Sequence, residues 1–238
     1  MSRVTAIGCA LILPLLLAAC AHTPLIATVP PPSRDEAIKQ LQAVTPCCKT
    51  WSELPFQMAL PASPHDFTLE PSSPVAELDG QRTHYLTFIL PAFHKPYRVL
   101  FRAQPSARHL SSSYLLAPTA TLLDAQFKPL HSSNDINLCE YIGWRPGLSG
   151  AFGSLTVDDS RAKYLVVTTS AAQLKASTYW EQSPTAFSSD ASSPAASGSF
   201  SIPHGPDGDL SAGILTSSYE GAVDNAICGK PKQGALLK

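Results

Sequence analysis

The chain has 238 residues, with 17 Lys and Arg against 18 Asp and Glu and a formal net charge of −1. Such a near-neutral balance disfavours nucleic-acid binding, because no excess of positive charge attracts phosphates. An apolar content of 44 % and a charged content of 15 % exclude a disordered protein. The 22 prolines disfavour long helices, because proline lacks an N–H donor and clashes with the preceding turn.

The N-terminal segment, residues 1–19, has the pattern of a secretory signal peptide. Arg3 supplies a positive charge, the apolar run Val4–Leu17 follows, and small residues precede Cys20. This run is shorter than the about 20 apolar residues that a membrane-spanning helix needs, and Pro14 interrupts it. We therefore expect the segment to be removed rather than to span a membrane.

The order Leu17-Ala18-Ala19-Cys20 resembles the bacterial lipobox. The resemblance implies cleavage before Cys20, lipidation of its thiol, and acylation of the new amine with a fatty acid such as palmitate. Two lipid signals already hold a protein stably on a bilayer, so three chains on one residue would anchor it firmly. Ala21 follows rather than Asp, which in Gram-negative lipoproteins favours the outer membrane. The alternative is a plain secretory peptide with a cysteine after its cleavage site.

Residues 20–34 are expected to form a lipid-anchored tether. The segment holds four prolines and no helical or strand period, and Pro-rich segments are extended, so it would span roughly 40 Å. A short helix and a Cys-Cys segment are expected over residues 35–50. The amphipathic helix covers Asp35–Val44, begins with acidic residues and ends before Pro46.

Residues 51–218 are expected to form the folded domain. The alternation is clearest in Tyr97–Ala103, where Tyr97, Val99 and Phe101 lie on one face and both arginines on the other. We expect strands over residues 83–90, 97–103, 114–117, 119–123, 155–157, 163–169, 199–202 and 210–216. Strands that recur at short intervals with turns between them predict a mainly β chain, an antiparallel β-sandwich-like domain with one or two short helices.

Three connections carry further expectations. Residues 83–90, apolar on both faces, are predicted as a central strand, and Asp158–Arg161 is predicted as the turn of a hairpin. A helix is predicted over Ala171–Tyr179, capped by Ser170. A loose serine-rich loop is expected over residues 183–198, and residues 219–238 are expected to form a C-terminal tail.

Three segments resemble the maltose-operon periplasmic protein family. They are residues 72–103, with an Asp79-Gly80 turn and the Pro96-Tyr97-Arg98-Val99 strand start, residues 122–130 and residues 163–169. The resemblance implies a β-sandwich-like domain resident in the cell envelope and a link to maltose or maltodextrin uptake. No catalytic motif belongs to the matching segments.

Four cysteines remain after the lipobox: Cys47, Cys48, Cys139 and Cys228. An exported protein meets oxidising conditions, so disulfides are expected. Two arrangements stay open: a vicinal Cys47–Cys48 ring with a Cys139–Cys228 bridge, or two bridges from the adjacent pair to the distant cysteines. Free thiols and a metal site are the alternatives, but no Cys-x-x-Cys pair occurs.

Catalytic and cofactor motifs are not found. The seven histidines are single, and Gly147-Leu148-Ser149-Gly150-Ala151 lacks the final glycine of a nucleophile elbow around Ser149. No phosphate-binding glycine loop or dinucleotide fingerprint occurs. We expect no catalytic residue, no metal and no cofactor.

Four aromatic residues are candidate sugar contacts: Tyr141, Trp144, Tyr179 and Trp180. Aromatic rings with a polar edge combine apolar contact with hydrogen bonding and so suit sugar faces. The alternative is that these rings fill the ends of a β-sandwich as core residues.

The sequence therefore predicts a non-enzymatic envelope lipoprotein, an accessory or interaction module linked by resemblance to maltodextrin transport. The alternative function is direct carbohydrate binding. The expected partners are a membrane, through the lipid anchor, and either an envelope protein or maltodextrin, but no nucleic acid.

Overall fold

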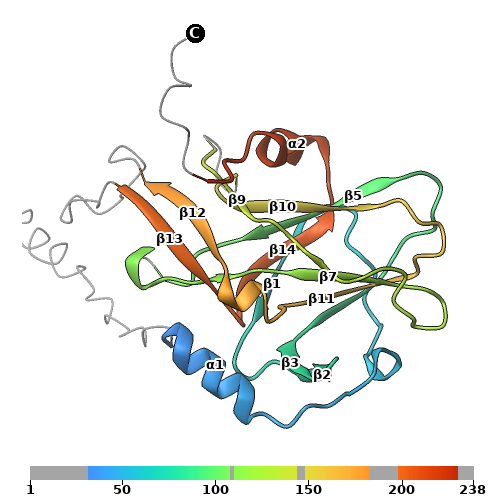
Figure 1. Ribbon diagram of the computed structural model, residues 1–238. Coiled ribbons are helices and arrows are strands. Elements are labelled where there is room, and N and C mark those ends of the chain that lie inside the picture. Colours follow the sequence, from blue (N-terminus) through green and yellow to red (C-terminus); the bar gives the residue numbers. More distant parts are fainter. Residues whose placement is uncertain (1–31, 108–109, 144–147, 183–197, 230–238) are drawn as a thin grey trace, which may run out of the picture. The chain divides into compact units, whose positions relative to one another are not determined.

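The computed structural model describes residues 32–107, 110–143, 148–182 and 198–229. Two antiparallel sheets pack face to face (Figure 1). The first sheet has five strands, in the spatial order β1 (His65–Leu69), β14 (Gly208–Ile214), β5 (Tyr97–Ala103), β10 (Gly150–Val157) and β9 (Cys139–Tyr141). The second has four strands, in the order β4 (Leu86–Ile89), β11 (Tyr164–Thr168), β7 (Thr119–Leu123) and β8 (Asn134–Asp135). The predicted mainly β, sandwich-like fold is confirmed.

Two smaller sheets and several helices complete the domain. A three-stranded sheet has the order β12 (Ser177–Gln182), β13 (Gly198–Gly205) and β6 (Leu115–Leu116), with β13 and β6 parallel. A hairpin joins β2 (Val75–Leu78) to β3 (Gln81–His84). The helices are α1 (Arg34–Ala43), α2 (Ser217–Asp224) and the 3₁₀ turns Trp51–Glu53, Leu110–Ser112 and Gln173–Lys175. Within these described residues, no helix is long and apolar enough to cross a membrane.

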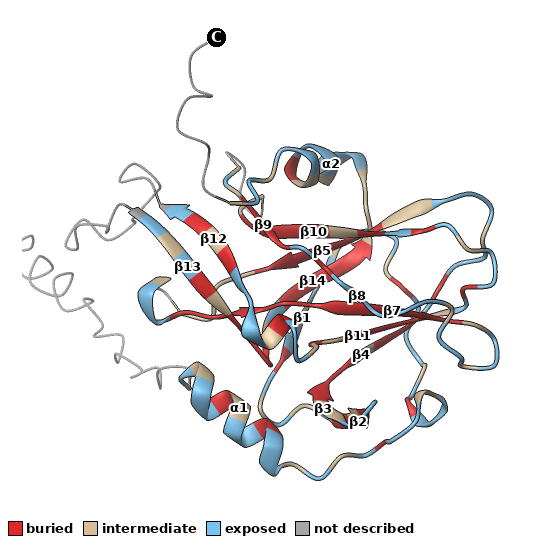
Figure 2. Ribbon diagram, viewed as in Figure 1, coloured by how far each residue is buried: buried red, intermediate tan, exposed pale blue. Residues whose placement is uncertain are grey.

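The main core lies between the two large sheets, because each strand turns alternate side chains inward. On β5, Val99 and Phe101 are buried in this core, as the alternation predicts. Leu100, on the other face of β5, is buried as well, in a separate cluster beneath α2. Figure 2 shows the buried residues concentrated on the strands, while α1 and α2 expose much of their surface.

The β2–β3 turn forms as the sequence predicts. Asp79 and Gly80 have φ values of 51° and 78°. Positive φ at both central residues is the geometry of a tight two-residue hairpin, and glycine adopts it without a steric cost.

The prediction of one central strand over residues 83–90 is wrong. The chain forms β3 and β4 on either side of Tyr85, and β4 lies at the edge of its sheet. Only one face of β4 lies in the main core, which it enters through Leu86 and Phe88. On the other face, the buried Thr87 hydroxyl donates to the Pro55 carbonyl at 2.6 Å, while Ile89 is 40 % exposed. The segment before residue 61 pairs with the free edge of the strand, where the Leu60 N–H donates to the Ile89 carbonyl at 2.9 Å. An apolar side chain on each face thus does not distinguish an edge strand from a central one.

The predicted hairpin around Asp158–Arg161 is also wrong. The turn is present, and Asp159 accepts hydrogen bonds from the backbone N–H and the guanidinium of Arg161 at 2.8 and 2.7 Å. The strands that it joins belong to different sheets, since β10 pairs with β5 and β9, while β11 pairs with β4 and β7. Turn residues determine the bend but not the pairing of the strands.

The expected helix over Ala171–Tyr179 is reduced to the 3₁₀ turn Gln173–Lys175. Its N-cap position is Ala172 rather than Ser170, although the Ser170 hydroxyl accepts a hydrogen bond from the Gln173 N–H at 3.0 Å. The chain then enters β12, which pairs with β13, since Thr178, Tyr179 and Trp180 favour a strand.

The C-terminal region differs from a simple tail. Residues 217–224 form α2, and Ile227 exchanges two backbone hydrogen bonds with Glu140 at 2.7 and 3.2 Å. The strands expected near 199–202 and 210–216 are confirmed as β13 and β14, although they enter different sheets. The tether before residue 32 and the loop over 183–197 lie outside the described residues.

Candidate functional site

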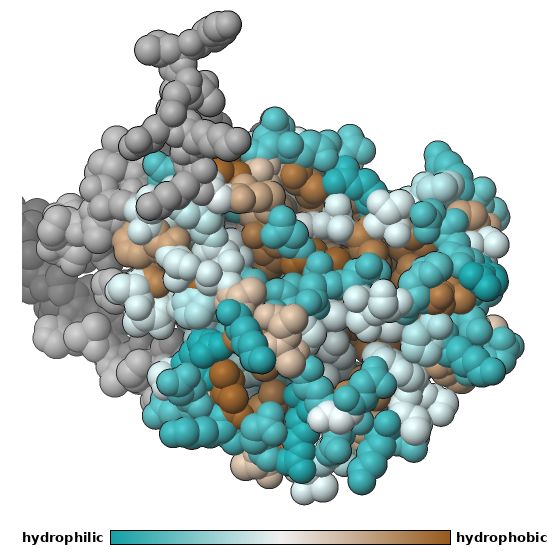
Figure 3. Space-filling view, in the orientation of Figure 1, coloured by the Kyte–Doolittle hydropathy of each residue, from teal (hydrophilic) through white to brown (hydrophobic). Residues whose placement is uncertain are grey.

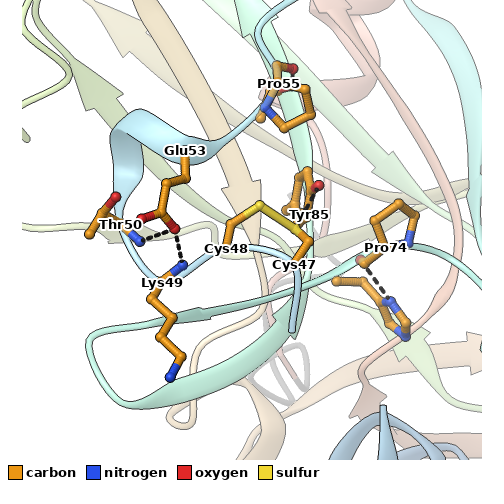
Figure 4. The surroundings of a disulfide bond; sticks show 10 residues. Cys47, Cys48, Lys49, Thr50, Glu53, Pro55, Pro74 and Tyr85 are labelled. Carbon is orange, nitrogen blue, oxygen red and sulfur yellow. Dashed lines mark hydrogen bonds between the residues drawn. A yellow bond between two sulfur atoms is a disulfide. The ribbon is translucent and has the colours of Figure 1, made fainter. Parts of the chain in front are cut away.

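Cys47 and Cys48 form a vicinal disulfide on the segment between α1 and the turn Trp51–Glu53 (Figure 4). The pair lies against β2 as a short parallel bridge between Cys48 and Ala76. The Cys47 N–H donates to the carbonyl of Val75, and the Glu77 N–H donates to the carbonyl of Cys48, both at 2.8 Å. The backbone of the disulfide is therefore held on β2.

The two sulfur-bearing residues lie in different surroundings. Cys47 is exposed, whereas Cys48 is 6 % exposed and packs in a second hydrophobic cluster. The Sγ atom of Cys47 lies 3.3 Å from the Oη atom of Tyr85, whose residue is 8 % exposed. A disulfide sulfur carries no hydrogen, so the tyrosine hydroxyl is the donor. Burial raises the pKa of Tyr85, which keeps this hydroxyl protonated at neutral pH.

The turn that follows the disulfide is also hydrogen-bonded. Glu53 accepts hydrogen bonds from the backbone N–H groups of Lys49 and Thr50 at 2.7 and 3.4 Å (Figure 4). These bonds, the Lys49 bond foremost, hold the pKa of Glu53 below its usual value. Hydrogen bonds thus hold the backbone both at the disulfide itself and in the turn that follows it.

The second disulfide joins Cys139 on β9 to Cys228 after α2, with Cα atoms 4.5 Å apart and a sequence separation of 89. The structure thus has the first of the two pairing patterns that the sequence allows. Cys228 is exposed, and Cys139 is 5 % exposed. The Cys139 sulfur lies 4.0 Å from the carbonyl oxygen of Asn137, which can only accept a hydrogen bond.

Glu140, next to this disulfide, is a buried carboxylate that sequence reasoning missed. The residue is 2 % exposed, one oxygen accepts the Glu181 N–H at 2.6 Å, and the other has no hydrogen-bond partner. Burial raises the pKa of Glu140 to about 7; the Glu181 charge also raises it, while the hydrogen bond from the Glu181 N–H lowers it. Nothing in the sequence distinguishes this glutamate from an exposed strand residue.

The three aromatic candidates in the described part of the chain do not form one surface. Tyr141 packs edge-on against Phe152, with ring centroids 6.0 Å apart, in the cluster beneath α2. Trp180 is 8 % exposed and belongs to the main core, so the expectation of a sugar contact there is wrong. Tyr179 is adjacent to Trp180 on β12 and therefore lies on the opposite face, where its hydroxyl bonds that of Ser199 at 3.1 Å. Trp144 lies outside the described residues.

A different group of aromatic rings gathers on the outer face of the four-stranded sheet. Phe56, Phe127 and Tyr164 contact one another with ring centroids 4.5 to 5.3 Å apart. Phe127 has a φ of 58°, which is unusual for a bulky residue. Sequence reasoning missed the group because its members come from three distant segments.

A pocket of about 290 Å³ lies where β8, β12 and β13 approach one another. Its lining includes Asp135, Asn137, Gln173, Thr178 and His204. The Nδ1 atom of His204 donates to the carbonyl of Gln173 at 3.1 Å, and Nε2 accepts from the Thr178 hydroxyl at 2.9 Å. Burial lowers the pKa of His204, so the ring is neutral at neutral pH. The pocket therefore offers hydrogen-bonding side chains together with one carboxylate, that of Asp135.

The remaining candidates are placed as follows. Ser149 precedes β10 in a loop, and its hydroxyl accepts a hydrogen bond from the Gly143 N–H at 3.2 Å. A nucleophile elbow needs a strand before the serine and a helix after it, whereas Ser149 leads into a strand. In the described segments, no three His, Cys, Asp or Glu side chains are placed to hold a metal ion. Cys20 lies outside the described residues.

In the face shown in Figure 3, hydrophilic and neutral residues predominate, and hydrophobic residues show in separate patches below α2, across the middle of the face and near α1. No protein-family model matches the chain, and no curated protein or solved structure matches it either.

Proposed function

We propose that the chain is a lipid-anchored protein of the bacterial cell envelope, attached to the outer membrane through Cys20 on the periplasmic side. Its β-sandwich acts as a non-enzymatic accessory or interaction module. The observation that carries the proposal is the pairing of the cysteines, because all four in the described residues form disulfides. Such bonds persist in oxidising compartments outside the cytosol.

The remaining cysteines agree with this proposal. Of the six in the chain, Cys9 and Cys20 are left, and both belong to the N-terminal segment. Cys9 would leave with the signal peptide, and Cys20 would carry the lipid. The resemblance of the chain to the maltose-operon periplasmic protein family supports a role in maltodextrin uptake. In this role, the module would contact an envelope protein.

The lipid anchor is tested on protein purified from membranes of a Gram-negative host. Mass spectrometry should find Cys20 as the first residue with the added mass of its acyl chains. Cys20→Ala should move the protein from the membrane fraction to the soluble fraction. Cys9→Ala is the matched control, since it should leave both mass and fractionation unchanged. A native chain that begins at Met1, or one that lacks added mass, would contradict the proposal.

Direct carbohydrate binding is the second candidate, favoured by the polar pocket beside His204. Hydrogen-bonding side chains such as Asn137 and Asp135 suit the hydroxyl groups of a sugar, and the volume lies at the small end of ligand pockets. Calorimetry with maltodextrins should then show binding that Asn137→Ala weakens about tenfold, the effect of one or two lost hydrogen bonds. Both Asn137 and the control residue Asn134 are exposed, but only Asn137 lines the pocket.

The two candidates give different results. Unchanged binding in Asn134→Ala, together with weakened binding in Asn137→Ala, supports the carbohydrate module. If calorimetry detects no heat of binding at millimolar maltodextrin, direct carbohydrate binding is excluded and the protein-interaction module is the remaining candidate. Crosslinking in intact cells, followed by identification of the captured protein, then tests the interaction module.

A further inference from the structure

The vicinal disulfide differs from an ordinary stabilising crosslink. A disulfide stabilises a fold mainly by restricting the unfolded chain, and the effect grows with the length of the closed loop. Cys139–Cys228 closes a loop across 89 positions, whereas Cys47–Cys48 joins adjacent residues and closes only the small ring that these two residues form. Loop closure therefore does not explain the presence of the Cys47–Cys48 bond.

The surroundings of Cys47 and Cys48 resemble those that a reactive disulfide requires. Thiol–disulfide exchange needs one sulfur that an incoming thiolate can reach. A hydrogen-bond donor at that same sulfur favours the final step, in which this sulfur leaves the mixed disulfide as a thiolate. Cys47 is exposed, and the Tyr85 hydroxyl lies 3.3 Å from its sulfur. Cys48 is buried, so attack from solvent is directed to Cys47.

We propose that Cys47–Cys48 is a thiol–disulfide exchange site that oxidises a dithiol, with Cys47 as the attacked sulfur, Cys48 as its buried partner and Tyr85 as the hydrogen-bond donor. This activity does not depend on the lipid anchor. Cys139–Cys228 also pairs an exposed cysteine, Cys228, with a buried one, but the buried Cys139 sulfur faces the Asn137 carbonyl, which cannot donate a hydrogen bond.

The exchange is balanced in two steps. A thiolate of the dithiol attacks Cys47 Sγ; the bond between the two protein sulfurs breaks, and its electron pair leaves with Cys48 Sγ. Cys48 takes the proton of the second substrate thiol. That second thiolate attacks the substrate sulfur bound to Cys47, and Cys47 leaves as a thiolate facing the Tyr85 hydroxyl. The dithiol loses two electrons and becomes a disulfide, while the protein pair gains them.

A dithiol, rather than a monothiol, suits a vicinal pair. After a monothiol has attacked Cys47, the neighbouring Cys48 thiol can return and expel it, because the two cysteines are adjacent in the chain. A dithiol completes the reaction through its own second sulfur, in an equally intramolecular step. The pair should thus accept electrons from dithiols and resist monothiols.

The first experiment treats the folded full-length protein with dithiothreitol under native conditions. Free thiols are alkylated at intervals, and each cysteine peptide is quantified by mass spectrometry. We expect Cys47 and Cys48 to become alkylated at least ten times faster than Cys139 and Cys228. Reduced glutathione, added at the same concentration of thiol groups, should leave most of the Cys47–Cys48 disulfide intact. Equal rates at both disulfides, or equal yields with both reagents, would overturn the proposal.

The second experiment locates the attacked sulfur. In Cys48→Ser, oxidised glutathione should form a mixed disulfide on Cys47. In the complementary variant Cys47→Ser, Cys48 is buried and should react at least ten times more slowly. Similar rates for the two variants would contradict the assignment of roles.

The third experiment tests Tyr85 through the pH dependence of Cys47 alkylation by iodoacetamide in Cys48→Ser. Adding Tyr85→Phe removes the donor and should raise the pKa of the Cys47 thiol by about one unit, which slows alkylation near neutral pH roughly tenfold. The charged neighbours Lys49 and Glu53 remain in place. Tyr97→Phe is the matched control, because the Tyr97 hydroxyl is buried without a hydrogen-bond partner. The same pH profile in Tyr85→Phe and its control would exclude the proposed role of Tyr85.

Discussion

The two large sheets have different outer layers. The outer face of the four-stranded sheet is covered by the segment before β1 and by the β2–β3 hairpin, and the shared cluster holds seven buried residues: Cys48, Leu54, Ala76, Leu78, Tyr85, Leu123 and Val166. The outer face of the five-stranded sheet is covered by α2 and the residues after it. Its cluster holds three buried residues: Leu100, Phe152 and Ala222. A disulfide accompanies each layer, but only Cys139–Cys228 joins a layer to its sheet.

The difference shows where a covalent link contributes most. In the N-terminal layer, backbone hydrogen bonds join the segment before β1 to β2 within the layer and to β4 of the sheet, and the apolar cluster is larger. The C-terminal layer buries less, and the ion pair of Arg98 with Asp224, at 2.9 Å, lies at its surface. Exposed ion pairs contribute little. The long-range disulfide thus stabilises the layer that buries fewer apolar residues. The vicinal disulfide has no such structural role, which agrees with its proposed role in thiol–disulfide exchange.

Removing each disulfide should show the largest contrast. Cys139→Ala with Cys228→Ala should lower the free energy of unfolding by about 4 to 5 kcal/mol, the chain-entropy value for a loop of this length. Cys47→Ala with Cys48→Ala should cost at most about 1 kcal/mol, because no loop is opened. Urea denaturation of both double variants measures the two values. Equal losses would contradict the division between a structural and a reactive disulfide.

The buried carboxylate beside the structural disulfide should make the C-terminal layer sensitive to pH. The folded state raises the pKa of Glu140 to about 7, so the folded state binds the proton more tightly than the unfolded chain does. Its contribution is complete below the unfolded pKa and is lost as pH rises through about 7. Glu140→Gln imitates the protonated acid and should be more stable than the wild type at pH 8 by on the order of 2 kcal/mol.

Thermal or urea unfolding at pH 5 and pH 8 measures this effect. Glu220→Gln, at an exposed position on α2, is the control and should retain the wild-type change between the two pH values. If Glu140→Gln loses as much stability between pH 5 and pH 8 as the wild type does, the buried carboxylate is not its source.

The smallest expected effect concerns α1, which leads into the N-terminal layer. The Ser33 hydroxyl accepts the Glu36 N–H, and the Glu36 carboxylate accepts the Ser33 N–H at 2.8 Å, which is a capping box. Ser33→Ala should reduce stability by about 1 kcal/mol. Gln40→Ala, at an exposed position in the same helix, should change it by less than about 0.5 kcal/mol. Equal effects, measured by urea denaturation, would show that the cap does not hold the layer.

Local patterns in the sequence were sufficient for several elements. The alternation in Tyr97–Ala103 predicts β5, the Asp79-Gly80 pair predicts a tight turn, and the acidic residues at 35 and 36 predict the start of α1. These features depend on neighbours in the chain. The pairing of β10 and β11 could not be predicted in this way, because the turn between them has the same residues whether its strands pair or separate.

The candidate sites follow the same division. The chain order alone allowed two disulfide patterns, and the packing of β9 against the residues after α2 selects one. Tyr85 and Glu140 look ordinary in the sequence. Their properties come from burial and from groups distant in the chain, since Cys47 lies 38 residues from Tyr85 and Glu181 lies 41 residues from Glu140.

Residue order was enough to predict a mainly β domain, its turns and caps and a lipid-anchor motif, because each depends on a few adjacent residues. The folded chain decided which strands share a sheet, which cysteine of the adjacent pair is exposed and which carboxylate is buried. Those outcomes depend on the removal of water and on hydrogen bonds between distant segments, and such contacts exist only after the sheets have packed.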